Sequence, residues 1–350
     1  MTRLLRFGRL AAVIGVFFAI QACAGPEDLD DVGTDDSAVR VAELDVTLSL
    51  DQVAYAAHEP VLATVTVRNR GKNPAKVLSW MLPAADLEEP LFRLARADAE
   101  AQFVGAHYKR PPAAANDYVH LAAGESLTRT VDLARFYDLS VTGDYKIRVE
   151  IESRASNTVP AWIEGRAVAQ PEPPSVDLAG DDLSFSGRCD TDQRGFITRA
   201  VVNAASYSEN AKQYLAGSTH GSRYTTWFGA FAQARWDRVR ANFVAIDDAF
   251  DTKPITVDCK CKKPYYAYVY PTQPYVIYVC KVFWSAPETG TDSKAGTLIH
   301  EMSHFNAVAG TDDHVYGQSG CKSLAISDPG AAIDNADSHE YFAENTPPLP

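Results

Sequence analysis

The sequence lacks an excess of positive charge. It holds 33 Lys and Arg against 45 Asp and Glu, for a net charge of -12, and no basic segment offsets this balance. We therefore expect no nucleic-acid partner, because nucleic-acid binding requires clustered basic side chains. Beyond its N-terminal segment the chain also lacks an apolar run of the ~20 residues that span a bilayer, so we expect no membrane-spanning helix there.

Cysteine is scarce in the first half of the chain. Only Cys23 precedes Cys189, and five of the six cysteines lie in the C-terminal half. The rest of the composition is ordinary, with 46% hydrophobic and 22% charged residues. A chain of 350 residues with this composition predicts two globular domains, each long enough to bury a sizeable core.

The N-terminus has the pattern of an export signal, to which we assign residues 1–23. Three arginines precede an apolar run of eleven residues, Leu10 to Ile20, too short for an ordinary membrane span. Ile20-Gln21-Ala22-Cys23 resembles a bacterial lipobox, which would place a membrane-attaching lipid on Cys23. Secretory cleavage after Ala24 is the alternative, and we favour the lipoprotein. Both predict an exported protein, secreted or held at the cell surface or outer membrane.

The next segments differ in character. Residues 24–42 read as an acidic tether, because 27–36 holds six acidic residues and no basic one. Residues 43–168 contain short stretches that alternate apolar and polar residues between turn signals, which predicts an antiparallel β-sandwich of immunoglobulin-like type. No chemistry is visible there, and we interpret its histidines as surface residues: His58, His107 and His120.

A Pro-rich stretch, residues 169–185, predicts a linker. The remainder, residues 186–350, predicts an α+β domain that is mainly helical. Helices are expected over 194–215, 318–327 and from 329 to about 345, one or two more over 224–248, and strands over 265–270 and 275–279. An exposed edge of these strands could hold an extended peptide, and a buried core hairpin is the alternative.

The most informative stretch of the chain is a His-Glu-x-x-His motif. His300 and His304 are four residues apart, so on a helix both imidazoles lie on one face. The neighbouring Glu301 could act as general base towards a water. Asp292 or Ser293 is a suitable N-cap, and Gly310 a natural stop. The alternative is an amphipathic helix that happens to carry two histidines.

A catalytic zinc site needs a third protein ligand and an open fourth position. Asp313 lies nine residues after His304, past a glycine that lets the chain turn back, and Tyr316 could donate its hydroxyl to an oxyanion. The full pattern, His-Glu-x-x-His followed by Gly-Thr-x-Asp-x-x-Tyr-Gly, resembles the aspzincin metalloendopeptidases, the deuterolysin group. The resemblance implies a zincin-type domain that binds one Zn²⁺ per chain through His300, His304 and Asp313.

The same resemblance bears on the β-domain and the cysteines. Aspzincins are often made with a pro-segment, which favours that role for residues 43–168 over a permanent accessory module. It also implies disulfides that join Cys189 to Cys259 and Cys261 to Cys280. A structural zinc site built from these cysteines is the alternative. Cys321 is left over, and we expect it to be a small buried residue in a helix.

The last predicted helix carries two acids three residues apart, Asp337 and Glu340, and no Lys or Arg follows Lys322. Two unpaired carboxylates near a zinc could bind an ammonium group, and a solvated acidic helix end is the alternative. Asn335-Ala336-Asp337-Ser338-His339-Glu340-Tyr341-Phe342 is similar to the peptidyl-Lys metalloendopeptidases, a branch of the aspzincins. That similarity implies that these acids bind the lysine of protein or peptide substrates.

Three functional hypotheses follow. The first is an exported zinc endopeptidase that cuts on the amino side of lysine, with Glu301 as base and Tyr316 as oxyanion donor. The second is a protease of the same mechanism without lysine preference. The third is a non-catalytic surface binding protein with a vestigial zinc site, against which the intact Glu301 and Tyr316 argue.

Overall fold

The computed structural model describes residues 43–350 except 98, 169 and 219. The predicted signal, the lipid site on Cys23 and the acidic tether lie outside the described residues. Among the helices of the described part, none combines the length and apolar character needed to cross a membrane.

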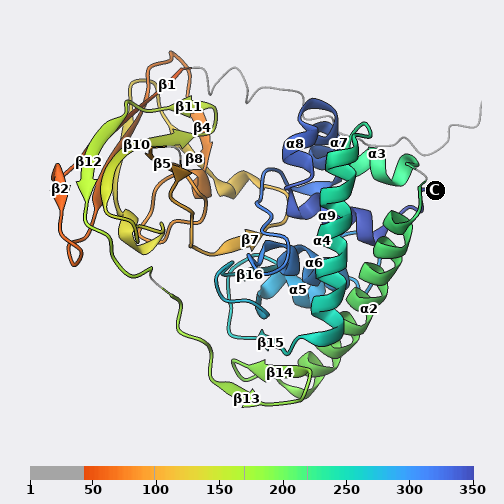
Figure 1. The fold of residues 1–350 in the computed structure, drawn as a ribbon. Helices are drawn as coiled ribbons and strands as arrows, with labels where there is room; N and C mark the ends of the chain where they lie inside the picture. Colours follow the sequence, from red (N-terminus) through yellow and green to blue (C-terminus); the bar gives the residue numbers. More distant parts are fainter. Residues whose placement is uncertain (1–42, 98, 169, 219) are drawn as a thin grey trace, which may run out of the picture. The chain divides into compact units, whose positions relative to one another are not determined.

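The N-terminal part consists of strands joined by turns and three short 3-10 helices (Figure 1). The strands are β1 Leu44–Leu50, β2 Ala54–Tyr55, β3 Leu62–Asn69, β4 Ala75–Leu78, β5 Phe92–Arg96, β6 Ala99–Glu100, β7 His107–Lys109, β8 Tyr118–Leu121, β9 Ser126–Asp132, β10 Gly143–Ile151, β11 Arg154–Ala155 and β12 Val159–Ile163. The 3-10 helices span Ser79–Met81, Ala115–Asp117 and Leu133–Arg135.

Alternation of apolar and polar residues builds the sheets of this part. In β3, Ala63, Val65 and Val67 are buried, whereas the threonines between them are half-buried on the other face. β3 pairs antiparallel with β1 and β9. A second sheet has the order β2-β12-β10-β5-β6, and both sheets contribute to one hydrophobic core. The predicted β-domain thus forms from largely antiparallel strands, and its immunoglobulin-like type stays a prediction.

A third sheet belongs to the C-terminal part, with the order β13-β14-β15-β17-β16-β7. Its strands are β13 Val176–Leu178, β14 Leu183–Ser186, β15 Ile255–Asp258, β16 Ala267–Val269 and β17 Val276–Val279, besides β7. β13 lies within residues 169–185, the expected linker, and β14 begins there and ends one residue beyond it. The structure differs from the prediction here because β14 pairs parallel with β15 and buries Phe185.

The helices of the C-terminal part pack into a second core, and Figure 1 shows the two long ones, α2 and α4, side by side. They are α2 Thr191–Ala216, α3 Ser222–Phe228, α4 Gln233–Thr252, α5 Lys281–Ser285, α6 Lys294–His304, α7 Gly317–Ser327, α8 Pro329–Ala332 and α9 Ala336–Glu344. Residues 224–248, where we expected one or two helices, contain two. Gly229 separates them with a φ of 79°, and a Cβ there would lie 2.2 Å from the carbonyl oxygen of Ala325.

The cysteines pair as the family resemblance implies. Disulfides join Cys189 to Cys259 and Cys261 to Cys280. The alternative of a structural zinc site made from these four residues is therefore wrong. Cys321 is a free, buried thiol in α7, as expected.

Candidate active site

Helix α6, which carries the His-Glu-x-x-His motif, is buried along its whole length. Ser293 caps its start, because the side chain accepts a hydrogen bond of 2.9 Å from a backbone N–H in the first turn. The helix ends earlier than predicted, since Phe305 leaves the helical conformation. Gly310 lies beyond it, in a left-handed turn with a φ of 60°. The two motif histidines therefore share one buried face of a short, well-fixed helix.

Three side chains converge beside this helix. The Nε2 atoms of His300 and His304 lie 3.1 Å apart, and the carboxylate oxygens of Asp313 lie 3.3 and 3.5 Å from them. The Asp313 Oδ1 atom has no hydrogen-bonding partner although it is buried. Separations of about 3.3 Å are expected between ligands that stand ~2.0–2.1 Å from a tetrahedral zinc. The three groups therefore fit a zinc ion with a fourth position left over.

An oxygen atom lies close to the Nδ1 atom of each imidazole ring, on the side away from the other ligands. The Nδ1 of His304 lies 2.8 Å from the carbonyl oxygen of Thr311. The Nδ1 of His300 lies 2.8 Å from Asp337 Oδ1. Such partners hold Nδ1 protonated and leave Nε2 free to bind a metal. The sequence predicts only a lysine-binding role for Asp337, and this contact is not visible in it.

Asn335 positions the loop that carries Asp313 and Tyr316. Its side-chain oxygen accepts hydrogen bonds from the backbone N–H groups of His314 (2.9 Å) and Val315 (3.0 Å). These two residues lie between the predicted ligand and the predicted oxyanion donor. No role of its own was predicted for Asn335, because hydrogen bonds between residues 20 and 21 positions apart leave no local signal in the sequence.

Glu301 is fully buried next to the first motif histidine, and neither of its carboxylate oxygens has a hydrogen-bonding partner. Burial raises its pKa to about 8, against the opposing charge of His304. An unpartnered buried carboxylate is costly unless something is to bind it. This position suits a group that exchanges protons with a bound molecule.

Helix α9 places two acids, Asp337 and Glu340, against α6, and both are buried. They are not a solvated helix end. Gly296 of α6 permits this approach, because a Cβ there would lie 2.9 Å from Glu340 Oε1 and 2.1 Å from Glu344 Oε1. The glycine is therefore needed for close packing of the two helices.

A lysine of the N-terminal part lies between these acids. The side chain of Lys109 in β7 is 1% exposed, and its Nζ lies 2.6 Å from Glu340 Oε2 and 3.3 Å from Asp337 Oδ1. Asp292 Oδ1 lies 3.5 Å away, and the Tyr266 ring centroid 4.9 Å away. The two acids thus form an ammonium-binding pocket together with groups that sequence analysis missed.

Strand β7 reaches the pocket by pairing antiparallel with β16, with Lys109 opposite Ala267 and Tyr108 opposite Tyr268. The strand edge that we considered for peptide binding is therefore covered by a segment of the chain itself. The hydroxyl of Tyr316 donates a 2.8 Å hydrogen bond to the carbonyl oxygen of Tyr108.

Comparison with known proteins now decides the family. Residues 213–344 match a family model described as lysine-specific metallo-endopeptidase. An extracellular protease of Aeromonas hydrophila is 42% identical over 336 residues, which cover 89% of this chain and 94% of that protein. The chain is an aspzincin zinc metalloendopeptidase. The predicted family and enzyme class are thereby confirmed.

Other relatives of this aspzincin have more specific names. The peptidyl-Lys metalloendopeptidase of Armillaria mellea is 34% identical and covers 89% of this chain and 95% of its own length. The one from Pleurotus ostreatus is 48% identical over 46% of this chain and 96% of its own. The solved zinc peptidase from Grifola frondosa is 41% identical, over 46% of this chain and all of that chain, with a TM-score of 0.45.

Burial dominates at Glu340 in the pocket of the aspzincin and raises its pKa well above the usual range against the charge of Lys109. The pKa shifts at Lys109 and Asp337 instead favour their charged forms. Burial opposes the charge on Lys109, but Asp337, Glu340 and Asp292 together raise its pKa well above the ordinary value. Burial alone would raise the pKa of Asp337, but Lys109 and His300 hold that pKa below its usual range. Lys109 is therefore a cation and Asp337 an anion at neutral pH.

Tyr316 keeps its proton in this site. Burial, together with the carboxylate of Asp313, raises its pKa well above 10 against the opposing charge of Arg110. Arg110 Nη1 donates a 2.8 Å hydrogen bond to the Tyr316 oxygen and also pairs with Glu89. The phenol is thus a hydrogen-bond donor with a fixed orientation.

One sequence-based interpretation is wrong. We expected His107 at the surface with His58 and His120, and the latter two are exposed. The His107 side chain is only 9% exposed, and its ring centroid lies 4.8 Å from that of His304. Its burial depends on contact with residues about 200 positions away, which alternation in the β-domain cannot reveal.

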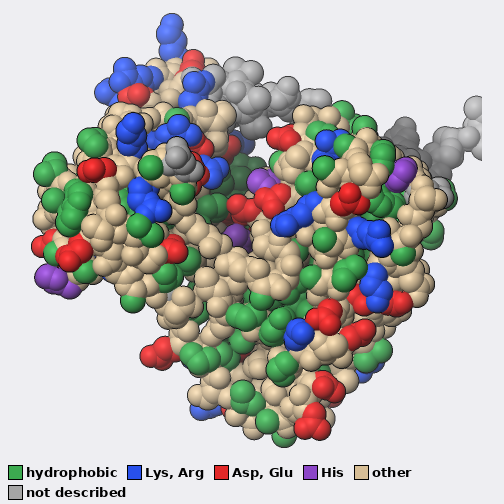
Figure 2. Space-filling view, viewed as in Figure 1, with side chains coloured by type: hydrophobic (Ala, Val, Ile, Leu, Met, Phe, Trp, Pro, Cys, Tyr) green, Lys and Arg blue, Asp and Glu red, His purple; other side chains and the backbone are tan. Residues whose placement is uncertain are grey.

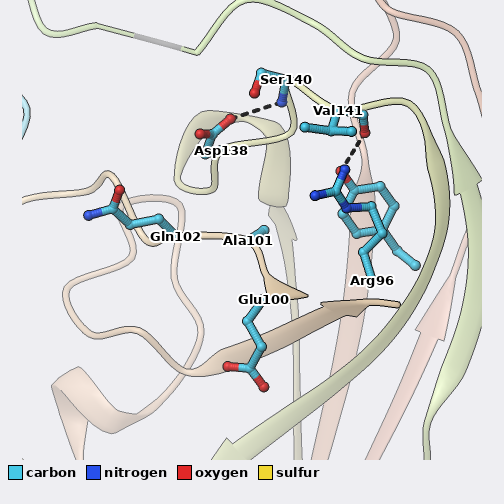
Figure 3. Close-up of a pocket in the computed structure, with 8 residues that line it drawn as sticks. Arg96, Glu100, Ala101, Gln102, Asp138, Ser140 and Val141 are labelled. Atoms are coloured by element: carbon cyan, nitrogen blue, oxygen red, sulfur yellow. Dashed lines mark hydrogen bonds between the residues drawn. The ribbon is translucent and has the colours of Figure 1, made fainter. Parts of the chain in front are cut away.

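A separate cavity lies in the N-terminal part and includes none of the predicted site residues. Figure 2 shows histidine and acidic side chains beside one another in a hollow of the face in view. The separate cavity, of about 120 Å³, is lined by Arg96, Glu100, Asp138 and Tyr145 among others (Figure 3). Asp138 accepts a hydrogen bond from the Ser140 N–H there, so local partners satisfy its carboxylate, and we assign the cavity no role.

Proposed function

We propose that this aspzincin is an exported zinc endopeptidase that hydrolyses peptide bonds on the amino side of lysine. The observation that carries the proposal is the position of Lys109, whose ammonium lies between the buried carboxylates of Asp337 and Glu340. A lysine side chain in this pocket, with the preceding carbonyl on Tyr316, is the arrangement that an Xaa-Lys substrate would require.

One zinc per chain would be held by His300, His304 and Asp313. When bound, zinc supplies Lewis acidity that polarises the scissile carbonyl and lowers the pKa of water towards ~7. Asp337 would orient His300 from its far side, and the Thr311 carbonyl would do so for His304. Asp337 would therefore serve both the metal and the lysine.

The other roles fall to residues of the chain itself. Glu301 would accept the proton of the attacking water and pass it to the nitrogen of the departing amine, as general base and then general acid. Its burial and lack of partners support this role. Tyr316 would donate its hydrogen bond to the oxyanion that develops on the scissile carbonyl, because its hydroxyl already contacts such a carbonyl.

The negative charge of the pocket would compensate for the hydration free energy that a lysine ammonium loses on entering it. Each charge-assisted hydrogen bond to Asp337 or Glu340 is worth about 1.5–3 kcal/mol. Asp292 and the Tyr266 ring would add a weaker attraction. The longer, planar guanidinium of arginine should fit poorly, because it differs in length and shape from the compact ammonium that the two acids contact in Lys109.

Residues 43–168 would be a pro-segment, removed by cleavage in 169–185 or just before Cys189. Support comes from β7, which covers the strand edge and the pocket that a substrate needs. Export is supported by the relative named as an extracellular protease. A lipid on Cys23 stays a prediction from the sequence.

The test uses three matched peptides that carry lysine, arginine or norleucine after the same residue. The processed enzyme should cleave the lysine peptide with a kcat/KM at least roughly a hundredfold above the norleucine peptide, and chelator should abolish cleavage. Equal rates would leave an aspzincin without lysine preference. No cleavage by a zinc-loaded, folded enzyme would support the non-catalytic alternative.

A further inference from the structure

The segment His107–Arg110 occupies the site in a definite register. Its side chains and backbone contact individual site residues, besides shielding the site from solvent. Lys109 fills the pocket. The carbonyl oxygen that precedes it belongs to Tyr108 and accepts the hydrogen bond of Tyr316. For an enzyme that cuts before lysine, the Tyr108–Lys109 bond therefore stands where the scissile bond belongs.

Strand pairing fixes this register independently. β7 runs antiparallel to β16, with Lys109 opposite Ala267 and His107 opposite Val269. A slip of one residue would turn Lys109 away from the acids and break the contact of Tyr108 with Tyr316. Extended peptides bind to strand edges in this way, by main-chain hydrogen bonds with alternate side chains in pockets.

The third contact of this segment is made by His107, which lies next to expected metal ligands. One ligand atom from each of His107, His304 and Asp313 can be chosen so that all lie within 4.8 Å of one another. The His107 side chain is only 9% exposed, and its Nδ1 lies 3.5 Å from Asp312 Oδ1. The three expected ligands leave one position open, and His107 is the imidazole beside two of them, His304 and Asp313.

We propose that His107 is a further zinc ligand in the uncut chain, and that it keeps the substrate-like Tyr108–Lys109 bond from being hydrolysed. This inference rests on the proposed function. With His107 in the fourth position, the place of the nucleophilic water is filled, and Glu301 has nothing to deprotonate. β7 is then a bound substrate that inhibits.

The reaction that His107 prevents is ordinary hydrolysis. Water would add to the carbonyl carbon of Tyr108, and the bond to the Lys109 nitrogen would break. Tyr108 would gain a carboxylate, and Lys109 would become a new N-terminus with a free amine. Loss of His107 from the metal should therefore convert β7 from an inhibitor into a substrate.

Zinc-edge X-ray absorption on the full chain tests the ligand directly, without any turnover. Glu301→Gln prevents self-cleavage. We expect three imidazoles on the zinc of this protein and two when His107→Ala is added. His120→Ala, an exposed histidine of the same domain, is the matched control and should keep three. Two imidazoles in the Glu301→Gln chain itself would overturn the proposal.

Intact mass spectrometry tests the consequence. The full chain with His107→Ala and an intact Glu301 should cut itself at Tyr108–Lys109, whereas the His120→Ala chain should not. A His107→Ala chain that cleaves an added lysine peptide but leaves this bond whole would contradict the proposal. A chain that cuts neither counts against the proposed function, and the imidazole count then still decides the role of His107.

Discussion

The Nζ atom of Lys109 lies 2.6 Å from the Oε2 atom of Glu340, although the two residues are 231 positions apart in the chain. Both side chains are at most 1% exposed. Removal of either member of a buried ion pair leaves the other charge unpaired, which is costly. A substitution at either residue should therefore have a large, measurable effect. The pocket can therefore be tested by substituting its acids, and its occupant by substituting Lys109.

Glu340→Gln should lower kcat/KM for Xaa-Lys peptides roughly 10- to 100-fold, because one charge-assisted hydrogen bond is lost. Zinc should stay bound, since Glu340 Oε2 lies 3.6 Å from His300 Nδ1, farther than Asp337 Oδ1 at 2.8 Å. Asp337→Asn should lower kcat/KM and also weaken zinc binding about 10- to 100-fold, because Asp337 orients His300. Competition with a zinc-binding dye measures the second effect, and equal zinc affinity of the two variants would refute the double role of Asp337.

Lys109→Ala should weaken the docking of β7 in the uncut chain. Removing one partner of a buried ion pair costs about 3–5 kcal/mol, because the other charge is left unpaired. The initial rate on added lysine peptide should therefore rise by up to ~100-fold before processing. Lys146→Ala, an exposed lysine of β10, is the control and should leave the rate unchanged. Equal rates in the two variants would show that Lys109 does not hold the uncut chain inactive.

Glu301→Gln removes the base and keeps the shape of the side chain. We expect kcat to fall by roughly 10²- to 10⁴-fold, the usual contribution of a general base, with one zinc per chain retained. His304→Ala should behave differently and lose the tightly bound metal. Atomic absorption with active-site titration separates the two outcomes, and near-normal turnover of Glu301→Gln would remove it from the mechanism.

Stability should fall at acid pH because of His339. Burial lowers the pKa of His339 to about 4, and its ring is held between Asn242 and the Asn335 carbonyl. Between pH ~6.5 and ~4 the unfolded chain binds a proton that the folded chain does not, so this contribution is full above pH 6.5 and is lost as pH falls. Its size is roughly 3 kcal/mol.

Urea unfolding of the Glu301→Gln protein at pH 7 and pH 4.5 checks this effect. His339→Gln should reduce the loss of stability between the two values, whereas the exposed His120→Gln should not. The same pH dependence in both variants would exclude His339 as the cause.

Local signals explain what could be predicted from the sequence. Spacing by four residues was enough to place His300 and His304 on one face, and Ser293 caps their helix as its residue type predicts. Alternation likewise predicted buried and exposed faces in strands such as β3. These patterns depend on neighbours a few residues away and hold regardless of the distant fold.

Long-range pairing explains what could not be predicted. Residues 107–109 look like any short strand, and only their pairing with β16 brings His107 and Lys109 to the site. The last predicted helix breaks into α8 and α9, and Asn335 at the break bonds to the loop of Asp313 instead. The family resemblance supplied the disulfides and the pocket acids, but covered only the C-terminal half and so missed the lysine that fills the pocket.

The most direct test of lysine specificity is the set of N-terminal residues on peptides that the processed enzyme releases from a denatured protein mixture. Mass spectrometry of that digest should find lysine at the new N-termini of nearly all products. The Asp337→Asn, Glu340→Gln double variant, loaded with zinc, should release few peptides and show little enrichment. New N-termini without lysine enrichment from the unaltered enzyme would contradict the account.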